Sequence, residues 1–207
     1  WSGEMPKKLI IVFEGIEGTG KSHHINKVAN YLRLNNKKFI KIREPGGSIN
    51  SEKIRKLILN NKSTFNQYTD LLLYLSARSE NLELIKTNIG KKIILIDRFT
   101  DSTIAYQHYG MGINLKFIMD INNFLLKSIK IDFTFLNTVS NKNMKNRLKK
   151  RKNLNRYDKF NHSFYDKVQK GFVKILKKNP KKYMQVDSNL SITHNENIIL
   201  KKIKDLI

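Results

Sequence analysis

A glycine-rich segment near the amino end constrains the fold of this chain more than any other feature. Residues 15–22 match the pattern GxxxxGK[ST]. The apolar run at 9–13 before it predicts a buried strand, and the apolar spacing at 22–34 after it predicts a helix. A loop of this kind turns backbone N–H groups inward around an anion at the helix N-terminus. The predicted ATP-binding residues are Gly15, Ile16, Glu17, Gly18, Thr19, Gly20, Lys21 and Ser22.

Short apolar runs alternate with helical patterns along the rest of the chain. Strands are predicted at 9–13, 39–42, 93–96, 133–136 and 183–186. Helices are predicted at 22–34, 52–59, 68–89, 115–126, 141–151, 163–178 and 195–206. The strand runs are rich in β-branched residues and do not alternate with polar ones, which indicates strands buried on both faces. We therefore predict an α/β fold, with a five-stranded parallel sheet and helices on both faces.

The predicted domain spans residues 5–207. Residues 1–4 read Trp-Ser-Gly-Glu, and we interpret them as added residues that precede a natural start at Met5. Residues 149–161 are dense in Lys, Arg and Asn and lie between two predicted helices. This composition favours a small basic flap that moves over a bound nucleotide.

The composition limits the possible partners and the compartment. The net charge of +23 raises the possibility of nucleic-acid binding, but the lysines are scattered and lack the aromatic interleaving of single-strand binders. We expect no specific nucleic-acid partner, and the charge would instead help to collect phosphorylated substrates. No apolar run approaches the roughly 20 residues that span a bilayer, so no membrane association is expected. The absence of cysteine suits a cytoplasmic location.

Polar residues follow the predicted strands at their carboxyl ends, where ligands gather in open parallel sheets. The second strand leads into residues 43–48 and the third into Asp97-Arg98. Asp97 is expected beside the first strand, where it and the Ser22 hydroxyl would bind Mg²⁺. Arg98 suits a planar, bidentate grip on phosphate. A structural ion pair between Asp97 and Arg98 is the alternative interpretation.

The long helix predicted at 68–89 carries two further candidates. Tyr74 and Arg78 lie one turn apart and share a face, so Tyr74 could stack on a base while Arg78 donates to one of its carbonyls. The alternative is core packing for Tyr74 and a surface charge for Arg78. The same helix has five consecutive apolar residues at 71–75 and is therefore apolar in most directions. This pattern indicates burial by the sheet on one face and by a partner subunit on another, and the alternative is a helix enclosed within its own domain.

Taken together, these segments resemble the thymidylate kinases, which transfer the γ-phosphoryl group of ATP to dTMP in dTTP synthesis. The matching segments are 13–22, 43–48, 97–107, 155–158 and 164–172, so the resemblance covers nearly the whole chain from Lys8 onward. Segment 97–107, with its spacing from 43–48, is highly specific. The resemblance implies the P-loop kinase fold of the bacterial-like branch, the substrates ATP and dTMP with Mg²⁺, and a homodimer.

The resemblance also implies which residues hold the sugar and phosphate of dTMP. Glu17 would accept a hydrogen bond from the 3′-hydroxyl of the deoxyribose. Arg55 and Arg98 would hold the phosphate of dTMP. Glu44, which is followed by Pro45, would lie near the transferring group and its Mg²⁺.

A second set of residues would form the base pocket by the same resemblance. Tyr74 would stack on thymine, where the family more often has Phe, and Arg78 would donate to the thymine carbonyl. Tyr106 would lie under C2′, where a ribose hydroxyl would clash. The remaining pocket residues would be Ser102, Thr103 and Gln107.

The source of an additional arginine divides the family into two branches. One branch has it in the phosphate loop, where this chain has Gly18, and the other supplies it from the flap. The flap offers Arg147, Arg151 and Arg156, and we favour Arg156, with Arg151 second. No general base is needed, because the accepting phosphate is mostly dianionic at pH 7. The predicted catalytic residues are Lys21, Glu44, Arg98, Arg151 and Arg156.

Two other functions remain open from the sequence alone. A deoxynucleoside kinase would need a carboxylate base near the 5′-hydroxyl of its acceptor, and Glu44 could fill that role. A basic nucleotide- or RNA-binding module would bind oligonucleotides in a salt-sensitive way without turnover.

Overall fold

The predicted sheet is present in the protein, whose computed structural model describes residues 8–207. The strands are β1 (Ile10–Gly15), β2 (Phe39–Arg43), β3 (Ile93–Asp97), β4 (Phe133–Thr138) and β5 (Tyr183–Asp187). They are hydrogen-bonded in the order β2-β3-β1-β4-β5, and every neighbouring pair is parallel. The prediction of a five-stranded parallel sheet in an α/β fold is therefore confirmed. The interpretation of residues 1–4 and of Met5 falls outside the described residues.

All seven predicted helices are present. They are α1 (Lys21–Leu34), α2 (Ile49–Leu59), α3 (Gln67–Asn88), α5 (Leu115–Leu126), α6 (Asn141–Lys149), α7 (His162–Lys178) and α8 (Ile192–Leu206). Helices α2 and α8 begin earlier than predicted because serines cap them: Ser48 accepts a hydrogen bond from the Ser51 N–H, and Ser191 accepts one from the His194 N–H. None of the helices in the described part of the chain is long and apolar enough to span a bilayer.

The segment after β3 contains helical turns that the sequence did not predict. Helix α4 (Thr100–Thr103) continues directly into the π-helical η1 (Ile104–Gly110), and two 3₁₀ turns, η2 (Arg156–Asp158) and η3 (Pro180–Lys182), follow later in the chain. Polar residues interrupt the apolar pattern at 97–107, so no helical period stands out there. Wide π turns frequently occur at functional sites.

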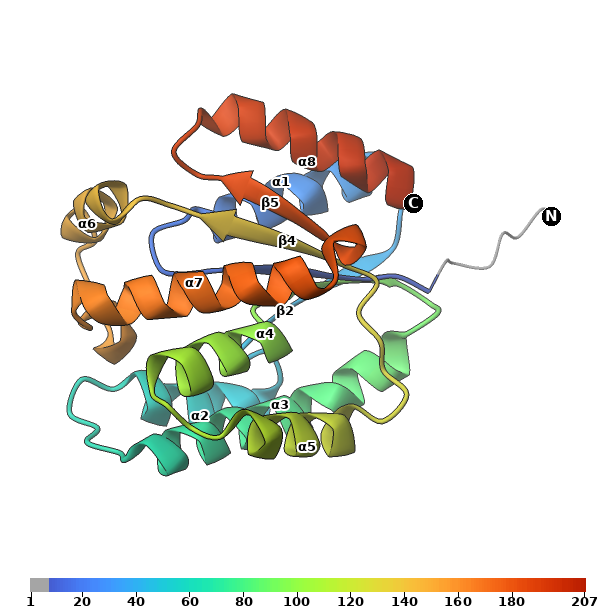
Figure 1. Ribbon diagram of the computed structural model, residues 1–207. Helices are drawn as coiled ribbons and strands as arrows, with labels where there is room; N and C mark the ends of the chain where they lie inside the picture. Colours follow the sequence, from blue (N-terminus) through green and yellow to red (C-terminus); the bar gives the residue numbers. More distant parts are fainter. Residues whose placement is uncertain (1–7) are drawn as a thin grey trace.

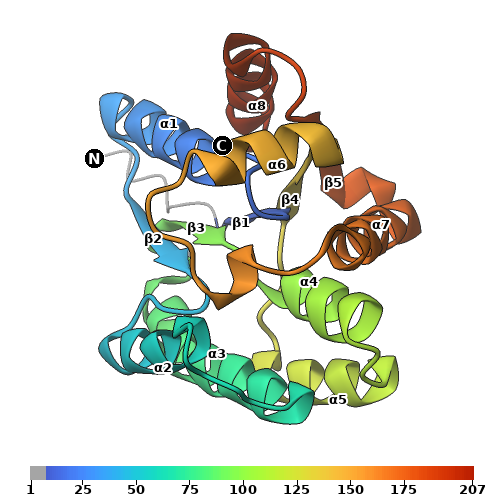
Figure 2. The same ribbon diagram turned by 90° about the vertical axis from the view of Figure 1, so that its left-hand side faces the viewer.

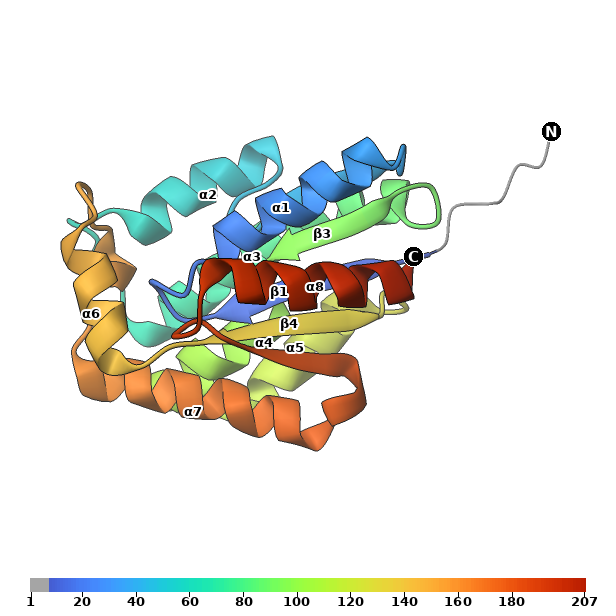
Figure 3. The same cartoon turned by 90° about the horizontal axis from the view of Figure 1, so that it is seen from above.

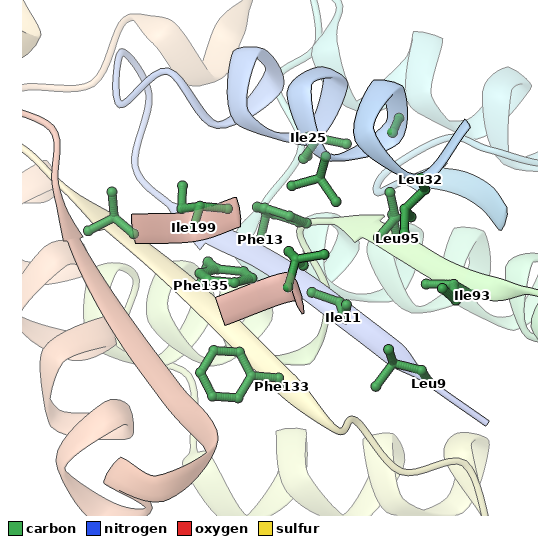
Figure 4. Close-up of a cluster of buried hydrophobic side chains, with 14 residues drawn as sticks. Leu9, Ile11, Phe13, Ile25, Leu32, Ile93, Leu95, Phe133, Phe135 and Ile199 are labelled. Atoms are coloured by element: carbon green, nitrogen blue, oxygen red, sulfur yellow. The ribbon is translucent and has the colours of Figure 1, made fainter. Parts of the chain in front are cut away.

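Helices cover both faces of the sheet in the way that the sequence predicts. Helices α1 and α8 lie on one face, and α2, α3, α4, α5 and α7 lie on the other (Figures 1 and 3). Under α1 and α8, the sheet and helices share a buried cluster of apolar side chains (Figure 4). Phe13 of β1 and Phe135 of β4 stack there with ring centroids 5.2 Å apart. Burial of each such side chain contributes about 1.5–3 kcal/mol to folding.

The parallel arrangement directs all five strands toward one edge of the sheet. The arrowheads of β4 and β5 point to the left in Figure 1, and Figure 2 views the molecule from that side. The flap between α6 and α7 crosses this edge above α2 and α3 (Figure 2). The loops after the strands therefore meet at a single edge, beneath the flap.

Candidate active site

The phosphate loop links β1 to α1 in a conformation that requires its glycines. Gly15 has φ 142°, and a Cβ there would lie 2.4 Å from the backbone oxygen of Asn137. Gly18 and Gly20 also have positive φ angles, of 74° and 80°. Because only glycine adopts such angles without strain, these residues let the loop close around an anion at the N-terminus of α1.

Side chains from the opposite half of the chain brace this loop. Arg147 donates to the backbone oxygen of Gly18 at 2.8 Å and to that of Ser188 at 2.6 Å. The Ser188 hydroxyl donates to the backbone oxygen of Thr19 at 2.8 Å. Arg147 was a flap candidate for catalysis, and in the structure its guanidinium binds the loop backbone. These contacts therefore fix the backbone of the phosphate loop.

Lys21, Ser22 and Asp97 meet below the loop. Lys21 Nζ lies 3.9 Å from Asp97 Oδ1, and Ser22 Oγ lies 3.5 Å from Asp97 Oδ2. Asp97 pairs across the sheet with Phe13 of β1, as expected from the sequence. Burial, reinforced by the charge of Arg98, lowers the pKa of Lys21 to about 8. A bound phosphate would favour the charged form of the lysine.

The residues at this point fit a magnesium ion. Asp97 Oδ1 is buried and has no hydrogen-bond partner among residues 8–207, so an oxygen ligand is available beside the Ser22 hydroxyl. The described residues contain no cluster of three His, Cys, Asp or Glu side chains that could hold a metal by themselves. Mg²⁺ is characteristically held by one or two carboxylates together with substrate phosphates and water. Ser22 and Asp97 match that kind of partial site.

Arg98 is held in an unusual backbone conformation beside the loop. Its φ angle is 65°, which is uncommon for a residue other than glycine and often marks a functional site. The guanidinium donates to Glu17 Oε1 at 3.0 Å and to Ser102 Oγ at 3.4 Å, and it lies 5.3 Å from the ring centroid of Tyr106. Tyr106 in turn donates its hydroxyl to Glu17 Oε2. Glu17, Arg98 and Tyr106 therefore form one connected group.

Glu14, which the sequence reasoning missed, fixes the turn that carries Arg98. Its buried carboxylate accepts hydrogen bonds from the N–H groups of Phe99 and Ser102 at 2.8 and 3.2 Å and from the Ser102 hydroxyl at 2.5 Å. Burial, followed by the nearby Asp101 carboxylate, raises the pKa of Glu14 to about 7. A lone acidic residue at the end of an otherwise apolar strand was the only sequence signal for this role.

We expect the Glu14→Gln variant to lose part of the pH dependence of folding stability. The folded pKa lies above the starting value of 4.5, so the protonated carboxyl stabilises the fold at low pH, and this contribution disappears as the pH rises through 7. Each pKa unit corresponds to about 1.4 kcal/mol, so the total is on the order of 3 kcal/mol. Thermal melts between pH 4 and 8 would measure it.

The matched control is Glu83→Gln, since the Glu83 side chain is 72% exposed. Wild type and the control should lose stability relative to Glu14→Gln as the pH rises. Parallel curves for all three proteins would contradict the raised pKa of Glu14.

Arg78 and Glu44 form a buried ion pair on the acceptor side of the site. Arg78 is 1% exposed and Glu44 is 6% exposed. The Arg78 guanidinium donates to Glu44 Oε1 from Nε at 2.9 Å and from Nη2 at 2.7 Å. It also donates to Asn122 Oδ1 at 2.6 Å and to Thr103 Oγ1 at 2.9 Å. Since a guanidinium has five N–H donors, one N–H on Nη1 remains for a ligand.

Glu44 keeps one oxygen for a further partner. Glu44 Oε2 is buried and lacks a hydrogen-bond partner within the described residues. Burial raises the pKa of Glu44, and the Arg78 charge opposes this rise. Both members of the ion pair therefore keep hydrogen-bonding capacity for a further partner, and both residues line the cavity described below.

One cavity of about 270 Å³ brings most of the predicted site residues together. The predicted residues that line it are Glu17, Lys21, Ser22, Glu44, Pro45, Arg55, Tyr74, Arg78, Asp97, Arg98, Ser102, Thr103, Tyr106, Gln107 and Arg151. It is also lined by residues that were not predicted to contribute: Arg43, Leu59, Phe99, Asn155, Tyr157 and Asp158. The cavity thus runs from the phosphate loop to the face of α3 that carries Tyr74 and Arg78.

The two favoured flap arginines have different surroundings. Arg151 lines the cavity, its side chain is 43% exposed, and its Nη1 donates to Asp158 Oδ1 at 2.7 Å. Arg156 is not among the described residues that line the cavity. Its guanidinium pairs with both oxygens of Asp70 and donates to the backbone oxygen of Ile58 at 3.0 Å. The Arg156 guanidinium therefore does not lie at the cavity, where an arginine that contacts the transferring phosphoryl group is expected.

Comparisons with known proteins agree on one family. A family model described as thymidylate kinase matches residues 13–199. A thymidylate kinase of Mycoplasma capricolum subsp. capricolum is 36% identical over 95% of this chain and 97% of its own length. One from Thermosipho africanus is 39% identical over 82% of this chain and 85% of its own. The crystal structure of thymidylate kinase from Ehrlichia chaffeensis superposes with a TM-score of 0.78 at 30% identity, covering 96% of this chain and 99% of that one.

Proposed function

The chain belongs to the thymidylate kinase family, and on this premise we propose that it transfers the γ-phosphoryl group of ATP to dTMP, giving dTDP for nucleotide synthesis. The observation that carries this function is the single cavity that joins the phosphate loop to Tyr74 and Arg78 on α3. A donor and an acceptor nucleotide can meet there with their phosphates together. The neighbouring Glu17, Arg98 and Tyr106 would hold the sugar and phosphate of the acceptor.

The direct test is turnover with ATP across a panel of acceptors. We expect the highest kcat/KM with dTMP and no phosphorylation of thymidine. A deoxynucleoside kinase would need a carboxylate base beside the 5′-hydroxyl of its acceptor, whereas the phosphate of dTMP needs none. Thymidine turnover without dTMP turnover would overturn the proposed acceptor. Salt-sensitive oligonucleotide binding with no turnover would instead favour a basic RNA-binding module.

On the donor side, we propose that charge neutralisation does most of the catalytic work. Lys21 would bind the terminal phosphates of ATP, and Ser22 and Asp97 would hold Mg²⁺. When bound, this ion would supply positive charge that offsets the negative charge of the ATP phosphates. Arg98 would orient the accepting phosphate, which needs no base to attack.

On the acceptor side, we propose that Tyr74 stacks on thymine and that the free N–H of Arg78 binds a thymine carbonyl. Arg55, whose Nη1 donates to the backbone oxygen of Pro45 at 2.6 Å, would hold the phosphate with Arg98. Glu17 would accept from the 3′-hydroxyl. Ser102, Thr103 and Gln107 would complete the base pocket, and Tyr106 would exclude a 2′-hydroxyl.

Arg78→Ala tests the acceptor side and is expected to act on both folding and binding. Losing one partner of a buried ion pair costs about 3–5 kcal/mol, because Glu44 would stay buried without a counter-charge. Adding Glu44→Gln removes that charge, so the double variant should regain stability and still show a raised KM for dTMP. Denaturant unfolding and KM values for dTMP and ATP measure the two effects. Equal KM changes for both substrates would argue against a contact with the base.

We also propose that the protein is a homodimer that pairs through α3 and α5. These helices pack against each other on the side of the molecule away from α1 and α8 (Figure 1). They expose large apolar side chains: Tyr68 and Leu72 on α3, and Phe117 and Phe124 on α5. Exposed apolar side chains on neighbouring helices are typical of an interaction surface.

The oligomeric state is measured by light scattering at micromolar concentration, and we expect the mass of a dimer. The Leu72→Glu and Phe124→Glu variants should shift the mass toward that of a monomer. Leu34→Glu is the control, because Leu34 is 74% exposed at the end of α1 on the opposite face. A monomeric wild type would reject the dimer. The cytoplasmic location stays a prediction.

A further inference from the structure

Asp70 is a buried carboxylate that joins the flap to the acceptor-binding helix. It lies in the first turn of α3 and is 2% exposed. Arg156 of the flap pairs with both of its oxygens, and the Tyr157 hydroxyl lies 3.3 Å from Oδ2. An acidic residue in the first turn can serve the helix alone. Here, however, Asn66 already caps α3 by accepting from the Thr69 N–H, and the Asp70 carboxylate accepts from Arg156 of the flap.

The flap turn that Arg156 anchors also holds Arg151. Residues 155–158 form a turn with internal hydrogen bonds: Asn155 accepts from the Tyr157 N–H at 2.8 Å, and Asp158 Oδ2 accepts from the Asn155 N–H at 3.0 Å. The other oxygen of Asp158 accepts from Arg151 at 2.7 Å. The position of Arg151 at the cavity therefore depends on a compact turn whose ion pair with α3 is the contact between Arg156 and Asp70.

The same turn contacts the pocket proposed for the acceptor base. Tyr157 packs edge-on against Tyr74, with ring centroids 5.6 Å apart at 83°. The Tyr157 hydroxyl also lies 3.4 Å from Gln107 Nε2. Asp70 lies one turn before Tyr74 on α3, so the base pocket and the anchor of the flap occupy adjacent turns of one helix.

From this chain of contacts, we propose that Asp70 is a positioning residue: by clasping Arg156, it holds the flap turn against α3 and keeps Arg151 at the transferring phosphoryl group. This inference rests on the proposed function, and it takes Arg151 as the flap arginine that acts on that group, because Arg151 lines the cavity. Arg156 then contributes indirectly, through the turn, and Arg151 directly. The ion pair between Asp70 and Arg156 thus connects the flap to α3, the helix whose Tyr74 and Arg78 are proposed to bind the base of the acceptor.

The test is a double-mutant cycle of Asp70→Asn with Arg151→Ala, measured as kcat at saturating ATP and dTMP. Asp70→Asn alone should lower kcat on the order of tenfold. A loss of about 1.4 kcal/mol in the stability of the flap position that holds Arg151 at the phosphoryl group would lower the population of that position by this factor. In the Arg151→Ala background the same change should alter kcat less than about twofold, because residues that act as a unit are not additive. Asp70→Glu, which keeps the charge, should retain more activity than Asp70→Asn.

The matched control is Asp132→Asn, which removes a carboxylate that accepts from the Ile10 N–H at the opposite end of the sheet. It should leave the effect of Arg151→Ala on kcat unchanged. If Asp70→Asn fails to fold, Arg156→Lys, which keeps the charge but loses the bidentate fork, replaces it in the cycle. If Asp70→Asn lowered kcat equally with and without Arg151, the proposed positioning role of Asp70 would be wrong. Full activity of Arg151→Ala would contradict it as well. A wild type that turns over thymidine but not dTMP would instead refute the proposed function.

Discussion

The Lys21→Ala variant is expected to lose phosphoryl transfer on the order of 10³-fold while keeping its fold. Lys21 is 8% exposed, and its Nζ lies beside Asp97, not in an apolar cluster. Removal of one group that stabilises developing charge typically costs about 10²–10³-fold in rate. The lysine also contacts the donor phosphates in the ground state, so the KM for ATP should rise with the fall in kcat.

The stability of the same variant distinguishes a catalytic role from a packing role. Burial, together with the nearby charge of Arg98, lowers the pKa of Lys21, because both disfavour the charged form of the lysine. Loss of the charge should therefore leave the melting temperature unchanged or slightly raised. Lys37→Ala, at an exposed position just after α1, is the control for a general effect of lost positive charge. Near-wild-type turnover in Lys21→Ala would contradict the assignment of the phosphate loop.

The parts of the site that could be predicted from the sequence depend on local order along the chain. The phosphate loop follows a strand and opens a helix, and Asp97 and Arg98 end another strand. Because parallel strands share one edge, their positions in the sequence were enough to bring them together. The five strands were found for the same reason, since each is a compact apolar run.

The parts that could not be predicted depend on contacts between distant segments. Arg156 meets Asp70 across 86 positions, and Glu14 meets Phe99 across 85. The sequence contains these residues but gives no sign of which ones pair. Asp70 reads as an ordinary acidic residue in the first turn of a helix, and Glu14 as an exception within an apolar strand.

The two flap arginines, Arg151 and Arg156, also differ through contacts that the sequence does not show. The sequence favoured Arg156 because it aligns with the flap motif of the family, and both residues lie in one basic segment. Alignment fixes a position along the chain, whereas the direction of a long side chain is set by its partners. Asp70 draws the Arg156 guanidinium to α3, and Asp158 holds that of Arg151 at the cavity. We therefore propose the direct role for Arg151.

Arg151→Lys is expected to lower kcat by a factor that approaches 10³, with little change in stability. An arginine that closes over a transferring phosphoryl group contributes about 10³-fold or more, and a lysine lacks the planar fork that spans two phosphate oxygens. Lysine can still pair with Asp158, so the buried carboxylate keeps a counter-charge. Since the contact is made chiefly in the transition state, kcat and kcat/KM should fall together. Steady-state kinetics and thermal melts measure both effects.

Arg156→Ala is the informative comparison, because it should combine a loss of activity with a lower melting temperature. Removing Arg156 leaves Asp70 buried without its ion-pair partner, which is costly to the fold. Gly18→Arg, which would return an arginine to the phosphate loop, is expected to rescue Arg151→Lys poorly. Gly18 has φ 74°, a backbone conformation that an arginine adopts only with strain. Full activity in Arg151→Lys, with Arg156→Ala inactive but normally stable, would return the direct role to Arg156.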